Sequence, residues 1–318
     1  MMSATRTETS LESVETLLRD ELAQGDAMIS TATPILRHLL VNDDRALFSD
    51  EVVARVRAMT ADAARQLLHA EARAGQIADR ASFLSEREDG LVEALVEEPA
   101  FLAHVHALSL EGTLALQLQA RCSIDGVLTP LLQELVASSD DFVAGSAMAV
   151  IAAQARFIQD HRRMAMPLRE LPGELFHKAL LVLRSHGGAR DESIVAAERA
   201  LREGYDEAHG RLGLLTRLVM RLTRPAPGAL DLGSAGLAVF STALAMATGQ
   251  ERELTVVSFS ERQLVRLALA LRAAGLDQPS VEEQLLVLHP AVALPAGFDQ
   301  LSAERAALLL ASSPRHEA

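Results

Sequence analysis

The sequence predicts an all-α protein built from stacked helical hairpins. Apolar residues recur three and four positions apart along most of the chain, and Gly, Pro and polar clusters interrupt that spacing at regular intervals. Only Thr255-Val256-Val257 resembles a strand, and three residues are too few for a sheet. The hairpins are expected to form a HEAT- or TPR-like α-solenoid or an irregular helical bundle, with a smaller C-terminal helical subdomain.

The spacing locates the helices, and the residues between them predict where helices begin and end. Leu114, Leu118 and Cys122 lie on one helical face, and this places Cys122 in the core. Hydroxyl and carboxylate side chains three positions apart predict capped helix starts at Thr9, Ser85, Ser258 and Ser280. Breakers predict helix ends at Asn42–Asp44, Pro99, Asp125-Gly126, Ser138–Asp140, Pro172-Gly173, Gly187-Gly188, Pro225–Gly228 and Pro290.

Two stretches, residues 90–121 and 126–156, share a pattern. Each has a shorter helix, a break, and a longer helix ending in Gln-Ala-Arg, and residues 34–73 give a looser third copy. A period of about 35 residues is in the range of helical-hairpin repeats. The alternative is that any protein of helical hairpins shows such self-similarity by chance.

The expected domains follow from these breaks. Residues 1–30 form an N-terminal helix or arm, residues 31–224 the hairpin domain, and residues 229–312 a C-terminal helical subdomain, with the boundary near residues 225–228. Residues 232–249 carry no charge and approach the length of a membrane span, but their small residues favour a buried, closely packed helix.

The composition limits the kinds of partner that this protein could bind and the cellular compartment in which it is expected. The 318 residues carry a net charge of −13, which lies entirely in residues 1–160, so nucleic acid is an unfavourable partner. Lys178 is the single lysine among 30 basic residues, a usage that suggests a bacterial genome rich in G and C. One cysteine excludes an internal disulfide, and residues 1–30 lack a secretory signal, so a cytoplasmic protein is expected.

The catalytic patterns are weak. His104 and His106 point about 200° apart on a helix and cannot bind one ion together. Glu174 and His177 have the E-x-x-H spacing of helical di-iron proteins, but the chain has no second copy of that motif. Nucleophile elbows, phosphate-binding loops and dinucleotide fingerprints are absent from the sequence. An enzyme is therefore the less favoured class, and neither a cofactor nor a metal is expected.

A first basic segment follows His161. Arg162 and Arg163 precede a strip of apolar residues that runs from Met164 to Leu171 and also contains Arg169. If the segment is exposed, the strip and the arginines would suit an acidic and apolar groove of a partner. If the strip is buried, it would be a turn between helix hairpins.

A second basic segment is the predicted helix 211–224, which has four arginines and no acidic residue. Arg217, Arg221 and Arg224 are expected on one flank beside an apolar face. Such a helix binds an acidic partner or an anionic membrane, or it is a structural helix whose arginines cover apolar surface.

These observations favour a non-enzymatic protein that binds a protein partner or acts as a regulatory scaffold through a helical-repeat surface. The predicted contact residues are Arg162, Arg163, Arg169, Arg217, Arg221 and Arg224. A homo-oligomer is compatible with the opposite charges of the two halves. The alternatives are a helical-bundle enzyme with a metal near Glu174 and His177, and peripheral membrane attachment through residues 211–224.

Overall fold

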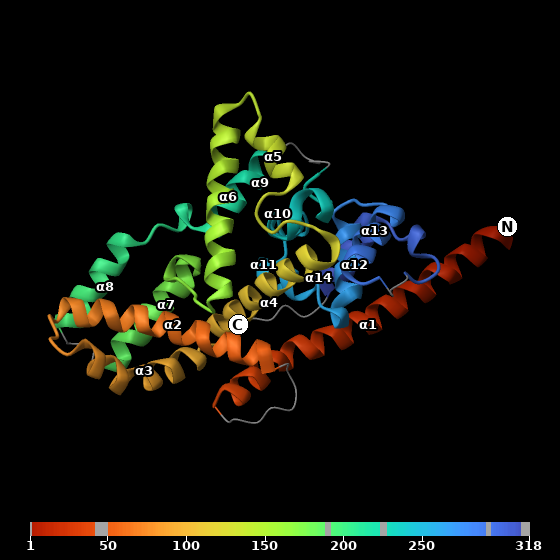
Figure 1. Cartoon of the computed structure of the whole chain (residues 1–318). Helices are drawn as coiled ribbons and strands as arrows, with labels where there is room; N and C mark the ends of the chain where they lie inside the picture. The colour runs from red at the N-terminus through yellow and green to blue at the C-terminus, as the bar shows by residue number, and fades with distance from the viewer. Residues whose placement is uncertain (1, 42–49, 188–191, 223–227, 291–293, 313–318) are drawn as a thin grey trace. The chain divides into compact units, whose positions relative to one another are not determined.

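A computed structural model describes residues 2–41, 50–187, 192–222, 228–290 and 294–312. These residues form fourteen α-helices and no strand, which confirms the all-α prediction (Figure 1). The helices are α1 (Met2–Val41), α2 (Asp50–Ala74), α3 (Arg80–Val96), α4 (Pro99–Cys122), α5 (Pro130–Val136), α6 (Asp141–Arg162), α7 (Gly173–Gly187), α8 (Glu192–Gly204), α9 (Arg211–Arg221), α10 (Leu232–Thr248), α11 (Arg252–Val257), α12 (Leu264–Ala273), α13 (Gln278–Leu288) and α14 (Ala303–Ser312). Short 3-10 turns are η1 (Leu168–Glu170), η2 (Glu207–His209), η3 (Glu261–Gln263) and η4 (Phe298–Gln300).

The chain divides into two compact units, each assembled from separate stretches of sequence. Unit 1 contains residues 1–32, 113–139 and 219–317, and unit 2 contains residues 33–112 and 140–218. The predicted boundary near residues 225–228 lies almost wholly outside the described residues, so the predicted domains remain a prediction.

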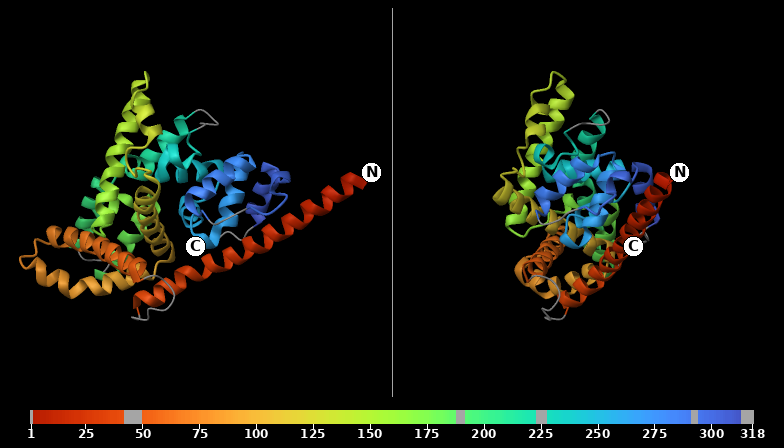
Figure 2. Two further views of the ribbon diagram at one scale, coloured as in Figure 1. Left: turned by 45° about the vertical axis from the view of Figure 1, so that its right-hand side comes forward. Right: turned by 90° about the vertical axis from the view of Figure 1, so that its right-hand side faces the viewer.

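Unit 2 contains a group of four helices. α2 packs against its neighbour α3 and also against α8, while α7 contacts α3 and α8. Figure 2 shows α2 and α3 running side by side. Met59, Ala63 and Leu67 on α2 are fully buried at spacings of four, so one face of this helix packs against its neighbours. This arrangement joins helices that lie more than a hundred residues apart.

Unit 1 is organised around α10 and α12. α10 contacts α5, α11 and α12, and α12 also packs against α13 and α14. Residues 235–245 of α10 are buried throughout, which confirms the prediction of a buried helix in this uncharged stretch. α10 is kinked at Gly236, whose φ of 68° and close contact with the Thr129 side chain both require the absence of a Cβ.

The part of α1 in unit 1 docks through an apolar stripe with charged pairs beside it. Val14, Leu18 and Leu22 are buried at spacings of four. Asp26 accepts a hydrogen bond from Arg266 of α12, and Glu15 accepts two from Arg305 of α14, at 2.8 and 2.6 Å. The pairs fix the register of the docked stripe.

The predicted capping residues are wrong, although the helices they were meant to start exist. α1 is helical from Met2, and Ser85 lies inside α3. Asp79 and Asp277 cap α3 and α13 instead, and each accepts a hydrogen bond from a backbone N–H three residues later at 3.1 Å. A short carboxylate immediately before the helix serves the exposed amides as well as a hydroxyl does.

The other expectations about helix ends have different outcomes. Cys122 is exposed at the last residue of α4, so its placement in the core is wrong: the apolar spacing reaches it only where the helix ends. Ser258 is not a helix start but the C-cap of α11. By contrast, Pro99 begins α4 and Asp140 caps α6, as the breakers predict. The breaker at residues 42–44 lies outside the described residues.

Candidate functional site

Arg162 and Arg163 lie at the C-terminal end of α6. Arg162 is in the last turn and Arg163 is the C-cap, and both side chains are exposed. The next residue, Met164, adopts a φ of 54° and turns the chain away from the helix axis. The helix end therefore presents two guanidinium groups to solvent, where they also complement the negative end of the helix dipole.

Arg169 also lies at this end of α6, where it pairs with Asp160. Its Nη2 donates to Asp160 Oδ2 at 2.7 Å, and the Arg169 side chain stays about half exposed. Burial raises the pKa of Asp160, although the charges of Arg169 and Arg163 both act to lower it. Because both arginines act on one carboxylate, the structure brings this predicted group together around the end of α6.

The apolar strip that follows Arg163 is mostly turned inward. Met166, Leu168 and Leu171 are buried. Two side chains of α2 hold the strip: Asp62 Oδ2 accepts from the Met166 N–H at 2.9 Å, and Gln66 donates to the Met166 carbonyl at 2.9 Å. The strip is thus largely a packed connector between α6 and α7, and the arginines and Met164 are the side chains that it exposes.

Helix α9 exposes part of the second basic segment. Arg217 and Arg221 are exposed, and Arg224 lies outside the described residues. Leu214, Leu215 and Leu218 are buried, so the apolar face of this helix is already occupied within the protein. A membrane could reach that face only if the helix left its present packing.

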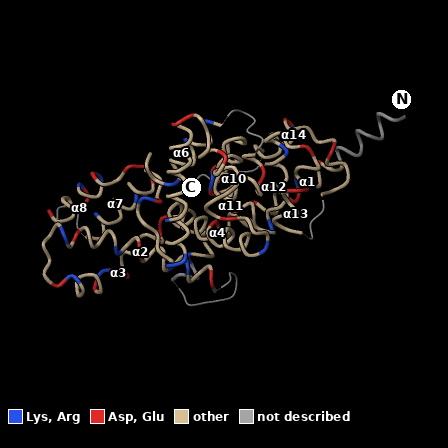
Figure 3. Tube along the Cα trace, turned by 45° about the horizontal axis from the view of Figure 1, so that its top comes forward, with Lys and Arg blue, Asp and Glu red and all other residues tan. Residues whose placement is uncertain are grey.

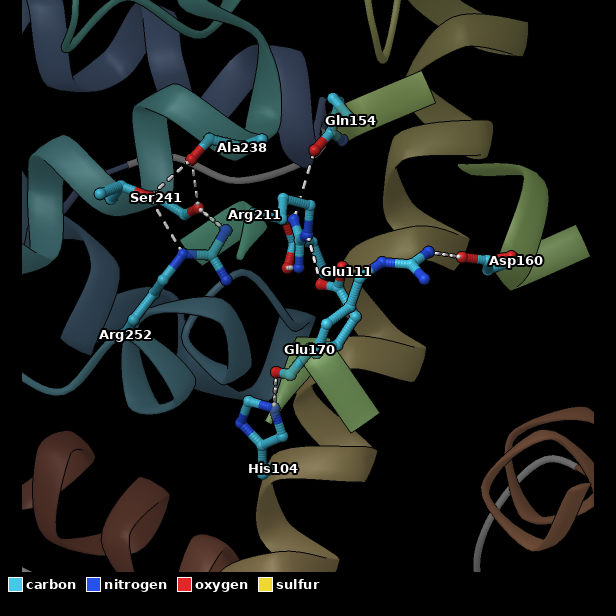
Figure 4. Close-up of polar contacts among 11 residues, drawn as sticks. His104, Glu111, Gln154, Asp160, Glu170, Arg211, Ala238, Ser241 and Arg252 are labelled. Atoms are coloured by element: carbon cyan, nitrogen blue, oxygen red, sulfur yellow. Dashed lines mark hydrogen bonds and ion pairs between the residues drawn. The ribbon is translucent and has the colours of Figure 1, made fainter. Parts of the chain in front are cut away.

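Arg211, the first residue of α9, is buried in a network within unit 2 (Figure 4). Its Nη1 and Nη2 donate to the two carboxylate oxygens of Glu111 at 2.7 and 3.2 Å, and its Nε donates to Glu170 at 2.8 Å. Gln154 accepts a further hydrogen bond at 3.3 Å, and the guanidinium carbon lies 3.7 Å from the centre of the Phe157 ring. One side chain thereby joins α4, α6, η1 and α9.

The two carboxylates of the network compensate for the cost of burying the charge of Arg211. Burial alone lowers the pKa of Arg211, but Glu111 and Glu170 reverse that effect and hold the pKa above its usual range. The backbone of Glu170 is fixed as well, since its carbonyl oxygen lies 2.9 Å from His104 Nε2. All of these groups are shielded from water, so the network serves the fold and is not an accessible active site.

The sequence contains a signal for this network, although the helix was expected to be a basic surface. Arg211, Leu214, Leu215 and Leu218 are spaced three, four and seven positions apart, which places the arginine on the apolar face. Buried arginines require carboxylate partners, and these come from distant parts of the chain.

Next to the network, His161 is buried without a hydrogen bond to either ring nitrogen in the described part of the protein. Burial and the nearby charge of Arg55 lower its pKa to about 4, while Glu111 acts in the opposite direction. Burial also lowers the pKa of His106 to about 4. Both imidazoles are therefore neutral at pH 7.

The predicted metal residues are engaged by basic neighbours. Glu174 pairs with Lys178 at 3.4 Å, and His177 Nδ1 lies 2.8 Å from Arg202 Nη2. Across the described residues no group of three or more His, Cys, Asp or Glu side chains is arranged to hold a metal ion.

One of the described helices resembles a membrane-spanning helix in length and composition. α6 alone among them has the length and apolar composition of a membrane span, and a third of its most apolar window is buried. One such helix is weak evidence, because a core helix of a soluble protein meets the same criterion.

The fold and these surfaces define an all-α protein with two compact units and exposed arginines at the ends of helices. Comparison of the chain with protein-family models, with curated proteins and with solved structures finds no match.

Proposed function

We propose that this chain is a non-enzymatic scaffold or regulatory protein of a bacterial cytoplasm that binds an acidic segment of a protein partner. The contact residues are Arg162, Arg163 and Arg169 at the end of α6, with Arg217 and Arg221 on α9. The hairpin-repeat surface belongs to the same proposal. Its support is the succession of a shorter and a longer helix in α3–α4 and again in α5–α6.

One contrast between buried and exposed cations carries the proposal. Arg211 and Arg266 are buried and pair with carboxylates of the chain. The side chains of Arg162 and Arg217 are exposed and make no hydrogen bond or ion pair with the described residues. Cations that the fold leaves unused on a strongly acidic protein are available to a carboxylate of a partner.

The test is charge reversal at the end of α6. The tagged protein is used to capture partners from a lysate of its native host, and the captured proteins are identified and rebound in purified form. Arg162→Glu combined with Arg163→Glu is expected to weaken binding of the purified partner at least tenfold, because attraction becomes repulsion at two positions.

Arg73→Glu is the matched control. Arg73 is an exposed arginine in the last turn of α2, just as Arg162 lies in the last turn of α6. The control should bind like the wild type, and circular dichroism should show equal helicity for all variants. Equal loss in the control, or full binding by the double variant, would show that the end of α6 is not the contact surface.

A further inference from the structure

An open cavity of about 390 Å³ lies beside α7 and α8 in unit 2. One lining residue, Arg184, comes from the last turn of α7. The others lie on one face of α8, at spacings of three, four, seven and eight positions: Val195, Glu198, Arg199, Arg202 and Glu203. Charged positions along α7 and α8 are visible in Figure 3. Of the six lining residues, only Val195 is uncharged.

Glu198 fixes two of the three arginines. Its side chain is 9% exposed and accepts hydrogen bonds from Arg202 Nη2 and Nε at 2.8 and 3.1 Å. Arg184 Nη2 donates to its other carboxylate oxygen. Burial raises the pKa of Glu198, but the hydrogen bonds and charges of Arg202 and Arg184 outweigh it and lower the pKa. The ionised carboxylate therefore orients both guanidinium planes.

The cavity retains more donors than the chain uses. A guanidinium has five N–H donors, and Glu198 together with His177, whose Nδ1 lies 2.8 Å from Arg202 Nη2, cannot engage all those of two arginines. Arg184 Nε has no hydrogen-bond partner in the described part of the chain, but it is buried, so Arg184 would reach a ligand only through its Nη atoms. The side chain of Arg199 makes neither a hydrogen bond nor an ion pair with any described residue. The lining carries three positive and two negative charges, so its net charge is positive.

We propose that this cavity binds the phosphate group of a small phosphorylated molecule through Arg184, Arg199 and Arg202. Phosphate suits the site because it offers at least three strong acceptor oxygens and up to two negative charges for three arginines, whereas a carboxylate group offers two oxygens and one charge. The cavity has room for a small polar group in addition to the phosphate. Because no aromatic residue lines it, the site lacks the stacking surface that a nucleotide base would use.

The test is isothermal titration calorimetry with inorganic phosphate and with glycerol 3-phosphate at constant ionic strength. Both are expected to bind the wild-type protein saturably, and glycerol 3-phosphate at least as tightly as phosphate. Arg199→Gln should weaken binding of both about tenfold or more, since a hydrogen bond between charged groups contributes about 1.5–3 kcal/mol. Arg199 makes no internal contact that folding depends on, so the variant should retain wild-type helicity.

Arg73→Gln, which removes an exposed arginine from another helix of unit 2, should bind both ligands like the wild type. Absence of saturable binding, equal binding by Arg199→Gln, or equally tight binding of acetate would each overturn the proposal. Binding of inorganic phosphate alone would refute the phosphorylated molecule as the ligand. The proposal does not depend on partner binding: the variant with Arg162→Glu and Arg163→Glu should bind both ligands normally.

Discussion

The imidazole of His161 lies directly against the α-carbon of Gly112, in the space that a side chain at position 112 would occupy. Gly112 is on α4 and His161 on α6, and the His161 ring is 1% exposed. The missing Cβ therefore sets how closely the imidazole approaches α4. Because His161 is held by buried neighbours, it has little room to retreat.

We expect Gly112→Ala to destabilise the protein by about 2 kcal/mol or more, because the new methyl group overlaps a buried ring. Urea denaturation followed by circular dichroism measures the change. Gly145→Ala in α6 is the control. A Cβ there meets no atom within 4 Å, so helix propensity should make this variant more stable by up to about 1 kcal/mol. Equal effects of the two substitutions would contradict the close packing at Gly112.

The pKa of His161 predicts a loss of stability in mild acid. Its pKa is about 4 in the folded protein, below its ordinary value of 6.5, so between these pH values the unfolded chain binds the proton more readily. Stability conferred by the neutral ring is present above pH 6.5 and is lost as the pH falls towards 4. From pH 7 to pH 5 the loss from this residue is about 2 kcal/mol.

The measurement compares urea denaturation at pH 7 and pH 5 for the wild type and for His161→Phe, which keeps an aromatic ring but cannot be protonated. The variant should lose about 2 kcal/mol less than the wild type over this range, whatever its stability at pH 7. His106 titrates in both proteins and cancels in the comparison. An unchanged pH dependence would show that His161 is not buried as a neutral ring.

Arg211→Met is expected to destabilise the protein by about 3–5 kcal/mol, because it leaves Glu111 and Glu170 buried without their cation. Adding Glu111→Gln and Glu170→Gln to this variant should restore a large part of the loss, since no unpaired charge then remains. Chemical denaturation of the single and triple variants measures both effects. If the triple variant were as unstable as the single one, the packing of the Arg211 side chain would matter more than its charge.

Tyr205 is the only tyrosine of a chain without tryptophan, so its ionisation can be followed directly by ultraviolet absorbance. Its hydroxyl donates to the Leu171 carbonyl at 2.7 Å, and its ring stacks on Phe176. Burial is the largest cause that raises its pKa, and the charges of Glu207 and Asp206 add to this effect, so that the pKa is about 12. At pH 10.5 the folded protein should therefore show little phenolate.

In urea the phenolate should form near the ordinary pKa of about 10. Because the folded pKa is the higher one, the contribution of the neutral phenol to stability is complete below pH 10 and is lost as the pH rises towards 12. A folded protein that titrates near pH 10 would show that Tyr205 is neither buried nor hydrogen-bonded as described.

Several features of this protein follow from local sequence and are predictable from it. The all-α class, the break at Pro99 and the burial of residues 235–245 depend on apolar spacing and on backbone restrictions within a few residues. The sequence leaves open whether Arg162 and Arg163 are exposed; both side chains are exposed at the end of α6, and their role stays a prediction.

Other features depended on the tertiary structure. Arg211 belongs to a basic segment by sequence, yet it is buried because Glu111, a hundred residues earlier, supplies a carboxylate. The cavity beside Glu198 is lined by arginines from two different helices. The position of the His161 ring depends on Gly112 of α4, which has no side chain to exclude it. Helical periodicity tells which face of a helix is buried, but not which distant charge or empty space that face meets. Those pairings are decided by how separate stretches of the chain pack together.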